Sequence, residues 1–279
     1  MTAEESILKA AKAIKDANAL LIAAGAGMGV DSGLPDFRGD EGFWKAYPPL
    51  KHLGISFVDM ANPAWFRTKP RMAWAFYGHR FFLYCSTVPH EGFSILKRWS
   101  ESKEHGAFVF TSNVDGQFEK AGFGGNLIYE CHGSINHLQC LSPCSDDIWK
   151  AADLDFDVDL SDMTIEGAMP RCKRCEEIAR PNVLMFGDCS WVADRTDGQR
   201  VRLDNWLGEV DGKKLVIIEC GAGTAVPTVR MNSEAIQRSS GATLVRINTR
   251  ESFGPAGTIS IPTGALEGIR LIDKAMKQL

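Results

Sequence analysis

The sequence predicts an α/β protein with a doubly wound parallel sheet and a second, smaller lobe. Uniformly apolar runs of strand length recur along the 279 residues, and segments with helical periodicity separate them. Strands of this kind are buried on both faces, as in a parallel sheet that helices cover on both sides. Two other segments, one rich in aromatic residues and one rich in cysteines, do not follow this pattern and predict the smaller lobe.

The first helix and the first strand follow from residue spacing. Ile7, Ala11 and Ile14 recur at helical spacing, and Asn18 ends that pattern before the apolar run 19–24. Glycine follows the run directly, and ligands of a doubly wound sheet bind beyond the carboxyl ends of its strands. The later runs that predict strands are residues 108–110, 183–186, 215–218 and 244–247.

The two segments outside this pattern differ in composition. Residues 37–88 are rich in aromatic side chains, which on helices form packing faces more often than ligand sites. Residues 134–180 hold two cysteine pairs on either side of the alternating acidic run 153–159. That run lacks the glycine and the terminal glutamate of a calcium-binding loop, so we expect a solvated strand or loop.

Composition restricts the classes of partner. The chain is 44% apolar and 24% charged with a net charge of −4, so it lacks a sequence-wide basic surface for direct nucleic-acid binding. It contains no apolar run of the length that a membrane span needs, and its first residues do not resemble a secretory signal. We therefore expect no membrane contact and a cytoplasmic location, with the nucleus as the alternative.

Eight cysteines in such a compartment are expected to stay reduced. Two pairs with spacings of three and two intervening residues offer four thiolates that can converge on a zinc ion. The alternative is that some of the four are merely buried. Four thiolates leave no open position for water, so the predicted zinc is structural. The predicted ligands are Cys140, Cys144, Cys172 and Cys175, whereas Cys85, Cys131, Cys189 and Cys220 are expected to be buried.

The glycine loop after the first strand indicates a phosphate-binding site. Gly25 and Gly27 match the first two glycines of a dinucleotide fingerprint, but Val30 stands where the third would be. Such a loop lets backbone amides approach a pyrophosphate at a helix N-terminus, although an ordinary tight turn can have the same glycines. The continuation through residues 35–38, Pro-Asp-Phe-Arg, places an aromatic ring and a guanidinium next to this loop.

Taken in order, these motifs resemble the sirtuin family of NAD-dependent protein-lysine deacylases. The similarity covers nearly the whole chain. Besides the loop at 25–38 and the two cysteine pairs, the matching segments are 111–116, 131–133, 180–188 and 247–248.

The resemblance implies a Rossmann-like domain and a small lobe made of a helical module and a zinc ribbon. In residue numbers, the NAD-binding domain comprises 1–36, 89–133 and 181–279. The helical module comprises 37–88, and the zinc ribbon 134–180.

The resemblance also implies the chemistry. The amide oxygen of an acylated lysine attacks the nicotinamide ribose and nicotinamide leaves, after which His132 deprotonates a ribose hydroxyl. This general-base role suits an imidazole that titrates near neutrality, although a buried histidine held by backbone is the alternative. Asn113 would hold the ribose hydroxyls or a water, and Asp115 the nicotinamide amide; either could instead cap a strand end.

The implied binding residues come from many loops. Tyr77 and Arg80 are three residues apart and resemble the pair that grips a carboxylate-bearing acyl chain in desuccinylating sirtuins. The alternative is that Tyr77 is core and Arg80 a surface residue. Phe186 and Gly187 would line the acyl-lysine channel. The implied NAD-binding residues are Gly25, Ala26, Gly27, Asp36, Phe37, Arg38, Ser112, Asn113, Asp115, Gly221, Gly223, Asn248 and Gly264.

The chain departs from the family pattern at several places. Gly29, Ser112 and the pair 117–118 differ from the usual residues, and the stretch 220–227 is shorter before its proline. Together with Glu219, that stretch is closer to the macrodomain-linked sirtuins that transfer ADP-ribose to proteins. The sequence therefore predicts an NAD-dependent deacylase, with protein ADP-ribosyl transfer and a catalytically silent NAD- or peptide-binding module as alternatives. It predicts neither the preferred acyl group nor the oligomeric state.

Overall fold

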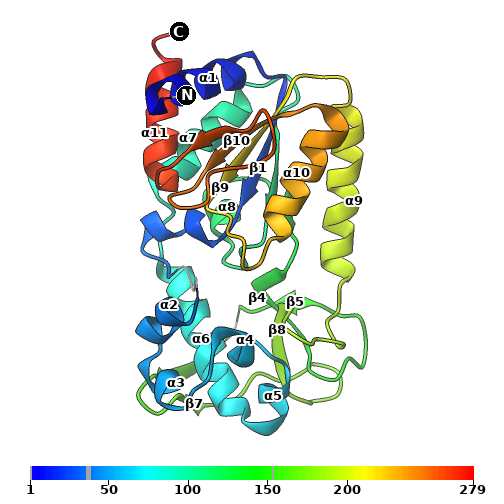
Figure 1. The fold of residues 1–279 in the computed structure, drawn as a ribbon. Coiled ribbons are helices and arrows are strands. Elements are labelled where there is room, and N and C mark those ends of the chain that lie inside the picture. The colour runs from blue at the N-terminus through cyan, green and yellow to red at the C-terminus, as the bar shows by residue number, and fades with distance from the viewer. Residues whose placement is uncertain (1, 36–38, 153) are drawn as a thin grey trace.

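A parallel sheet lies at one end of the molecule (Figure 1). The computed structural model describes residues 2–35, 39–152 and 154–279. In these residues the six-stranded sheet has the order β11-β10-β9-β1-β2-β3, and all its neighbouring strands pair in parallel. The predicted parallel sheet is therefore confirmed. Its strands are β1 (Ala19–Ala24), β2 (Ala107–Thr111), β3 (Ile128–Glu130), β9 (Leu215–Cys220), β10 (Thr243–Ile247) and β11 (Ile259–Ile261).

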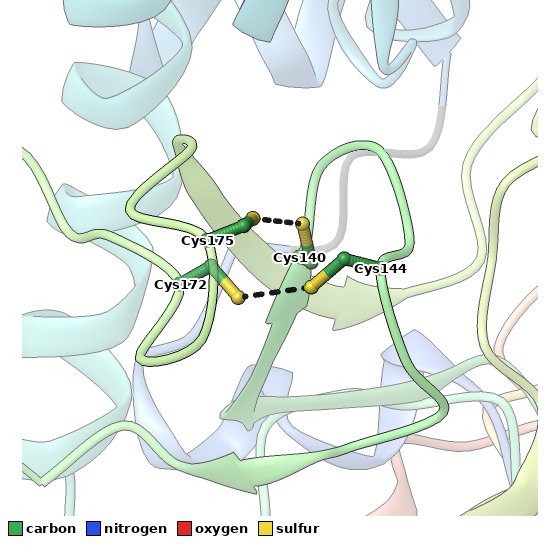
Figure 2. A group of neighbouring side chains, drawn as sticks. All are labelled: Cys140, Cys144, Cys172 and Cys175. Carbon is green, nitrogen blue, oxygen red and sulfur yellow. Dashed lines mark hydrogen bonds between the residues drawn. The ribbon is translucent and has the colours of Figure 1, made fainter.

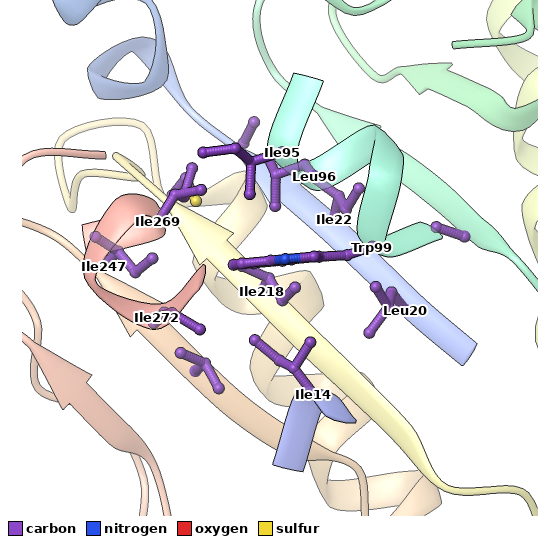
Figure 3. Packing of buried hydrophobic residues seen from close by; sticks show 14 of the residues in the cluster. Ile14, Leu20, Ile22, Ile95, Leu96, Trp99, Ile218, Ile247, Ile269 and Ile272 are labelled. Carbon is purple, nitrogen blue, oxygen red and sulfur yellow. The ribbon is translucent and has the colours of Figure 1, made fainter. Parts of the chain in front are cut away.

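Helices cover both faces of this sheet. On one face lie α1 (Ala3–Asp16), α7 (Glu91–Glu101) and α11 (Ala265–Met276), and their apolar residues share a core with the strands. Figure 3 shows Ile14, Trp99 and Ile272 of these helices packed against the central strands. On the other face lie α9 (Asp194–Glu209) and α10 (Thr228–Ser240) with a second core. Because both faces are covered, all six residues of β1 are buried, as its uniformly apolar sequence predicts.

The other end of the molecule consists of short helices and antiparallel strands (Figure 1). The three-stranded sheet has the order β5-β4-β8, and β6 pairs with β7 in a hairpin. The helices are α2 (Gly39–Ala46), α3 (Pro48–His52), α4 (Phe57–Met60), α5 (Ala64–Thr68) and α6 (Pro70–Ser86). The strands are β4 (Gly133–Cys140), β5 (Trp149–Lys150), β6 (Phe156–Asp159), β7 (Thr164–Gly167) and β8 (Ala179–Val183).

The aromatic side chains of the helical segment form the core of this end, as predicted from composition. Phe43, Phe66, Trp74 and Phe76 are fully buried in one cluster. Phe156 of β6 packs on Trp74, with ring centroids 5.7 Å apart. The acidic residues of β6 that alternate with its apolar ones face solvent, so residues 156–159 of the run form the solvated strand that the sequence predicts.

The apolar run 183–186 is not a strand of the parallel sheet, and this prediction was wrong. Val183 ends β8, which pairs with β4 in the antiparallel sheet, and the following residues leave the sheet. Leu184 and Phe186 are each 39% exposed. The run is apolar because it lines a cavity, described below, rather than because two layers of helices cover it.

Two further predictions concern the burial of the four unpaired cysteines and the presence of membrane-spanning segments. Cys131 and Cys220 are buried as predicted, but Cys85 and Cys189 are exposed, because one lies at the end of α6 and the other in a loop. In the part of the chain that the structure describes, no helix has both the length and the apolar character required to cross a membrane.

Candidate active site

A cavity of about 450 Å³ opens beyond the carboxyl ends of β1, β2 and β9. This is the edge of a doubly wound sheet at which ligands are expected. Residues from both ends of the molecule line it. The sequence-predicted residues among them are Gly25, Ala26, Tyr77, Arg80, Ser112, Asn113, Asp115, His132, Phe186, Gly187, Gly221 and Gly223.

Two loops meet at the floor of the cavity. The glycine loop after β1 continues into the short 3₁₀ helices Ala26–Met28 and Val30–Ser32, and the Gly27 N–H donates to the Gly221 carbonyl over 3.0 Å. Gly221 has a φ of +63°, and a Cβ there would lie 2.3 Å from the carbonyl carbon of Gly27. Only glycine allows this approach, so the loops after β1 and β9 form one continuous backbone surface.

Asn113 and Asp115 follow β2 and face the same cavity. The Asn113 side chain donates from Nδ2 to the Gly25 carbonyl over 3.0 Å, so it ties β2 to the glycine loop. Asp115 accepts from the Gln117 N–H at the start of α8 (Gln117–Lys120). Burial raises the pKa of Asp115 to about 6; the bond from Gln117 opposes this shift, and the nearby Glu130 carboxylate adds to it.

His132 lies in the turn between β3 and β4. Burial lowers the pKa of His132, and a hydrogen bond with the Ser112 backbone acts in the opposite direction. Its Nε2 lies 3.3 Å from Thr228 Oγ1. Gly133, which follows, has a φ of +78°, and a Cβ there would lie 2.1 Å from the Asn182 carbonyl oxygen. The close contact with β8 fixes the backbone that carries His132.

Three polar residues on one face of α6 form another wall of the cavity. Arg80 is 7% exposed and donates from Nε to the Tyr84 hydroxyl over 2.9 Å. Tyr77 is 1% exposed, and its hydroxyl has no hydrogen-bond partner among the described residues. Burial raises the pKa of Tyr77 to about 12, so the hydroxyl stays neutral. Arg80 is therefore not the surface residue of the alternative interpretation.

The predicted channel residues Phe186 and Gly187 line the mouth of the same cavity. Phe186 donates its N–H to the Ala61 carbonyl over 2.9 Å, and its ring lies 6.2 Å from that of Phe57. The Leu184 N–H donates to the His132 carbonyl. This segment therefore runs along the cavity from the histidine outward.

Some predicted NAD-binding residues lie elsewhere. Asn248 is buried, and it donates from Nδ2 to the Ala222 carbonyl over 2.8 Å, so it supports the loop after β9 from below. Gly264 precedes α11, and a Cβ there would lie 3.5 Å from the Asp31 carboxylate. Asp36, Phe37 and Arg38 lie outside the described residues.

Several cavity residues were not predicted from sequence. Tyr84 follows Arg80 by one helical turn, and that spacing could have identified it. The others are mostly apolar, and nothing in their local sequence distinguishes them from core residues. They are Leu34, Pro35, Phe57, Ala61, Val114, Val183, Leu184, Met185, Ala222, Ala225, Val226 and Val229.

The four paired cysteines form one cluster (Figure 2). Their Sγ atoms all lie within 4.8 Å of one another, with Cys140 and Cys175 3.7 Å apart and Cys144 and Cys172 3.6 Å apart. Tetrahedral zinc with Zn–S bonds of about 2.3 Å requires sulfurs about 3.8 Å apart. The cluster therefore fits a structural zinc ion held by these four residues, as the sequence predicts.

Comparisons with known proteins agree with this architecture. A protein of Aeropyrum pernix named NAD-dependent protein deacylase is 26% identical over 273 residues, which cover 98% of each chain. An NAD-dependent protein deacylase 1 of Archaeoglobus fulgidus is 29% identical over 248 residues, covering 88% of this chain and 86% of that one. Among solved structures, a Sir2 homolog–NAD complex superposes with a TM-score of 0.69 at 23% identity, covering 97% of this chain and 94% of that one. The family model described as Sir2 family matches residues 25–197, which is more than half of the chain, and the protein therefore belongs to the Sir2 family.

Proposed function

We propose that this protein is an NAD-dependent protein-lysine deacylase that releases nicotinamide and O-acyl-ADP-ribose. The observation that carries the proposal is the convergence of His132, Asn113 and Asp115 with the glycine loop on one cavity. The names of the relatives, NAD-dependent protein deacylase, support the same activity.

The cavity fits a dinucleotide. Its floor is the backbone surface where the loops after β1 and β9 meet, and the glycines of these loops, which have no side chains, let a dinucleotide approach the backbone closely. Gly25, Ala26, Gly27, Ser112, Gly221 and Gly223 would hold the dinucleotide there. We keep Asp36, Phe37, Arg38, Asn248 and Gly264 as proposed contacts on sequence grounds alone.

The polar residues of the cavity have separate roles. NAD supplies a reactive bond between nicotinamide and its ribose. Asn113, held against the glycine loop, would orient the ribose hydroxyls, and Asp115 would accept from the nicotinamide amide. His132 would take the proton of a ribose hydroxyl, and a pKa that burial lowers keeps the ring neutral and able to do so at pH 7.

For the acyl group we propose a chain that ends in a carboxylate, such as succinyl. Arg80 and Tyr77 line the cavity that contains His132. A carboxylate there can accept from the guanidinium and from the Tyr77 hydroxyl, which lacks a partner among the described residues. A buried cation that faces a ligand cavity favours an anionic group over an acetyl methyl.

Our proposal also covers the domain division, the substrates and the cellular location. We propose the division into a NAD-binding domain of residues 1–36, 89–133 and 181–279, a helical module of 37–88 and a zinc ribbon of 134–180. The substrates would be acylated lysine side chains of proteins, bound without direct contact to nucleic acid or membrane. We propose the cytoplasm or the nucleus as its location, on sequence grounds alone.

A mass-spectrometric assay tests the function. The purified protein is incubated with NAD and matched acetylated and succinylated peptides, and the peptides are weighed. We expect the succinylated peptide to lose its acyl group, with release of nicotinamide, and His132→Ala to abolish that loss. Intact peptides with no nicotinamide released would overturn the proposal and favour a silent binding module.

A gain of ADP-ribose by the peptide or the protein would favour ADP-ribosyl transfer instead. Glu219, one of the residues that motivate this alternative, lies in the interior. It accepts from Arg246 Nε over 2.6 Å and does not line the cavity. The position of Glu219 therefore does not support ADP-ribosyl transfer.

A further inference from the structure

The loop after β9 brings a hydroxyl to the ring of His132. α10 begins at Thr228, directly after Pro227, and Thr228 Oγ1 lies 3.3 Å from His132 Nε2. The two residues are 96 positions apart in the chain. The stretch 221–227 joins β9 to α10, so it sets the position of Thr228 at the carboxyl end of the sheet.

The Thr228 hydroxyl is not used to cap its helix. The capping position is occupied by Pro227, and no side-chain capping bond is made there. Among the described residues, the contact with His132 is the one hydrogen bond of Thr228 Oγ1. Val226 and Val229, on either side, line the same cavity as His132. Thr228 does not itself line the cavity, and its hydroxyl reaches the site through the contact with His132.

The partners of the ring decide which nitrogen carries a lone pair. The hydrogen bond with the Ser112 backbone raises the pKa of His132, so Ser112 contributes an oxygen that accepts from a ring N–H. A neutral imidazole has one N–H, and because Nε2 faces Thr228 we assign the hydrogen to Nδ1. Nε2 then keeps its lone pair, and the Thr228 hydroxyl donates to it.

We propose that Thr228 is a positioning residue for His132. The inference rests on the proposed function, in which His132 is the general base. Without ligand, the hydroxyl donates to Nε2 and holds the ring in the orientation and tautomer of a base. When a ribose hydroxyl takes the place of the Thr228 hydrogen at the single lone pair of Nε2 and passes its proton there, the Thr228 oxygen accepts the new N–H and stabilises the imidazolium.

The first test uses the protein without NAD. In ¹⁵N NMR of the imidazole nitrogens, the His132 signals are assigned by their loss in His132→Ala. We expect Nε2 of the wild type to be unprotonated and hydrogen-bonded. Thr228→Val keeps the branched shape of the side chain but lacks the hydroxyl. In this variant the Nε2 signal should move to the chemical shift of an unprotonated nitrogen that accepts no hydrogen bond. Thr228→Ser should resemble the wild type.

The second test separates the two chemical steps. Exchange of labelled nicotinamide into NAD reports the step before the base acts, and formation of O-acyl-ADP-ribose reports the step after it. Loss of one hydrogen bond predicts that Thr228→Val lowers kcat for product formation about tenfold. Exchange and KM for NAD should stay within about twofold of the wild type. Thr228→Ser should restore most of the rate, and Thr243→Val, at the far end of β10, is the matched control.

The outcomes are distinguishable. An unchanged Nε2 signal in Thr228→Val overturns the proposal whatever the activity, and so does an equal loss of exchange and product formation, which would indicate damage to the loop. If the wild-type protein releases no nicotinamide, the proposed function fails. The positioning of His132 is then still decided by the NMR comparison.

Discussion

At the scale of single residues, Asp115 combines a cost in stability with a proposed role in binding. Its pKa is raised to about 6 from an ordinary value of 3.8, with burial as the first cause. The folded protein therefore holds this proton more tightly than the unfolded chain. The free energy of unfolding falls as the pH rises from about 4 to about 6, and the full penalty is present at neutral pH.

We therefore expect Asp115→Asn to stabilise the protein at pH 7.5 while it weakens activity. The gain is at most about 3 kcal/mol, because the residue is half-buried and water in the cavity screens its charge. Near pH 4 the variant and the wild type should have the same free energy of unfolding. Denaturant titrations at pH 7.5 and pH 4 measure that free energy for both proteins. A variant less stable than the wild type at pH 7.5 would contradict the expectation.

Arg80 allows a second test at this scale, directed at the acyl group. Arg80→Met keeps the length and apolar stem of the side chain but removes its charge. We expect kcat/KM for a succinylated peptide to fall roughly 10- to 100-fold, the value of a charge-assisted hydrogen bond. The value for an acetylated peptide, measured in the same assay, should change little. Equal losses on both peptides would instead indicate that Arg80 supports the fold of α6.

Where a motif carried them, the predicted site residues lie together in the structure, although their roles stay predictions. His132, Asn113 and Asp115 each follow an element that could be placed from sequence, and all three reach one cavity. Thr228 could not be found in this way, because its contact joins residues 96 positions apart. The burial of Arg80 was also not predictable, since a charged residue on a helix is usually exposed.

At the scale of elements, uniformly apolar runs predicted β1, β2, β9 and β10 in the parallel sheet. The same pattern failed at residues 183–186, where apolar side chains line a cavity. Local composition cannot distinguish a strand covered by helices from the wall of a cavity, because both consist of apolar side chains. The zinc ribbon was predictable because its four ligands are fixed by cysteine spacing alone.

The ribbon provides a prediction at this scale. We expect the purified protein to contain one zinc ion per chain by elemental analysis, and Cys144→Ser to lose it. Binding of structural zinc is part of the folding free energy, so the variant should be destabilised by about 3 kcal/mol or more. Cys85→Ser, at an exposed cysteine on α6, is the matched control and should keep its zinc. Retention of zinc by Cys144→Ser would show that the cluster is not the site.

At the scale of the whole molecule, the sheet joins segments from distant parts of the chain. β9 lies between β1 and β10, so the centre of the sheet is completed only by the last third of the sequence. The order of the strands was not predictable from periodicity, which identifies strands but does not pair them. The doubly wound arrangement was predictable, because helices alternate with strands.

Truncation tests this dependence. A chain that ends before β9, at residue 212, should show no cooperative thermal unfolding, because β1 would lose its neighbour β9 and each face of the sheet would lose a helix, α11 from one face and α10 from the other. Circular dichroism melting measures it. Removal of residues 277–279, of which Lys277 is 70% exposed at its side chain, should leave the melting temperature nearly unchanged. A cooperative transition in the fragment that ends at residue 212 would show that the sheet can fold without β9 and the strands that follow it.

The β4 strand begins at Gly133, next to His132, and ends at Cys140, one of the four metal-site cysteines. A single strand therefore connects the proposed catalytic turn to the four-cysteine cluster. A chelating agent or an oxidant that strips the metal would act on turnover from outside the dinucleotide cavity. We expect that inhibition of that kind would not be relieved by raising the NAD concentration.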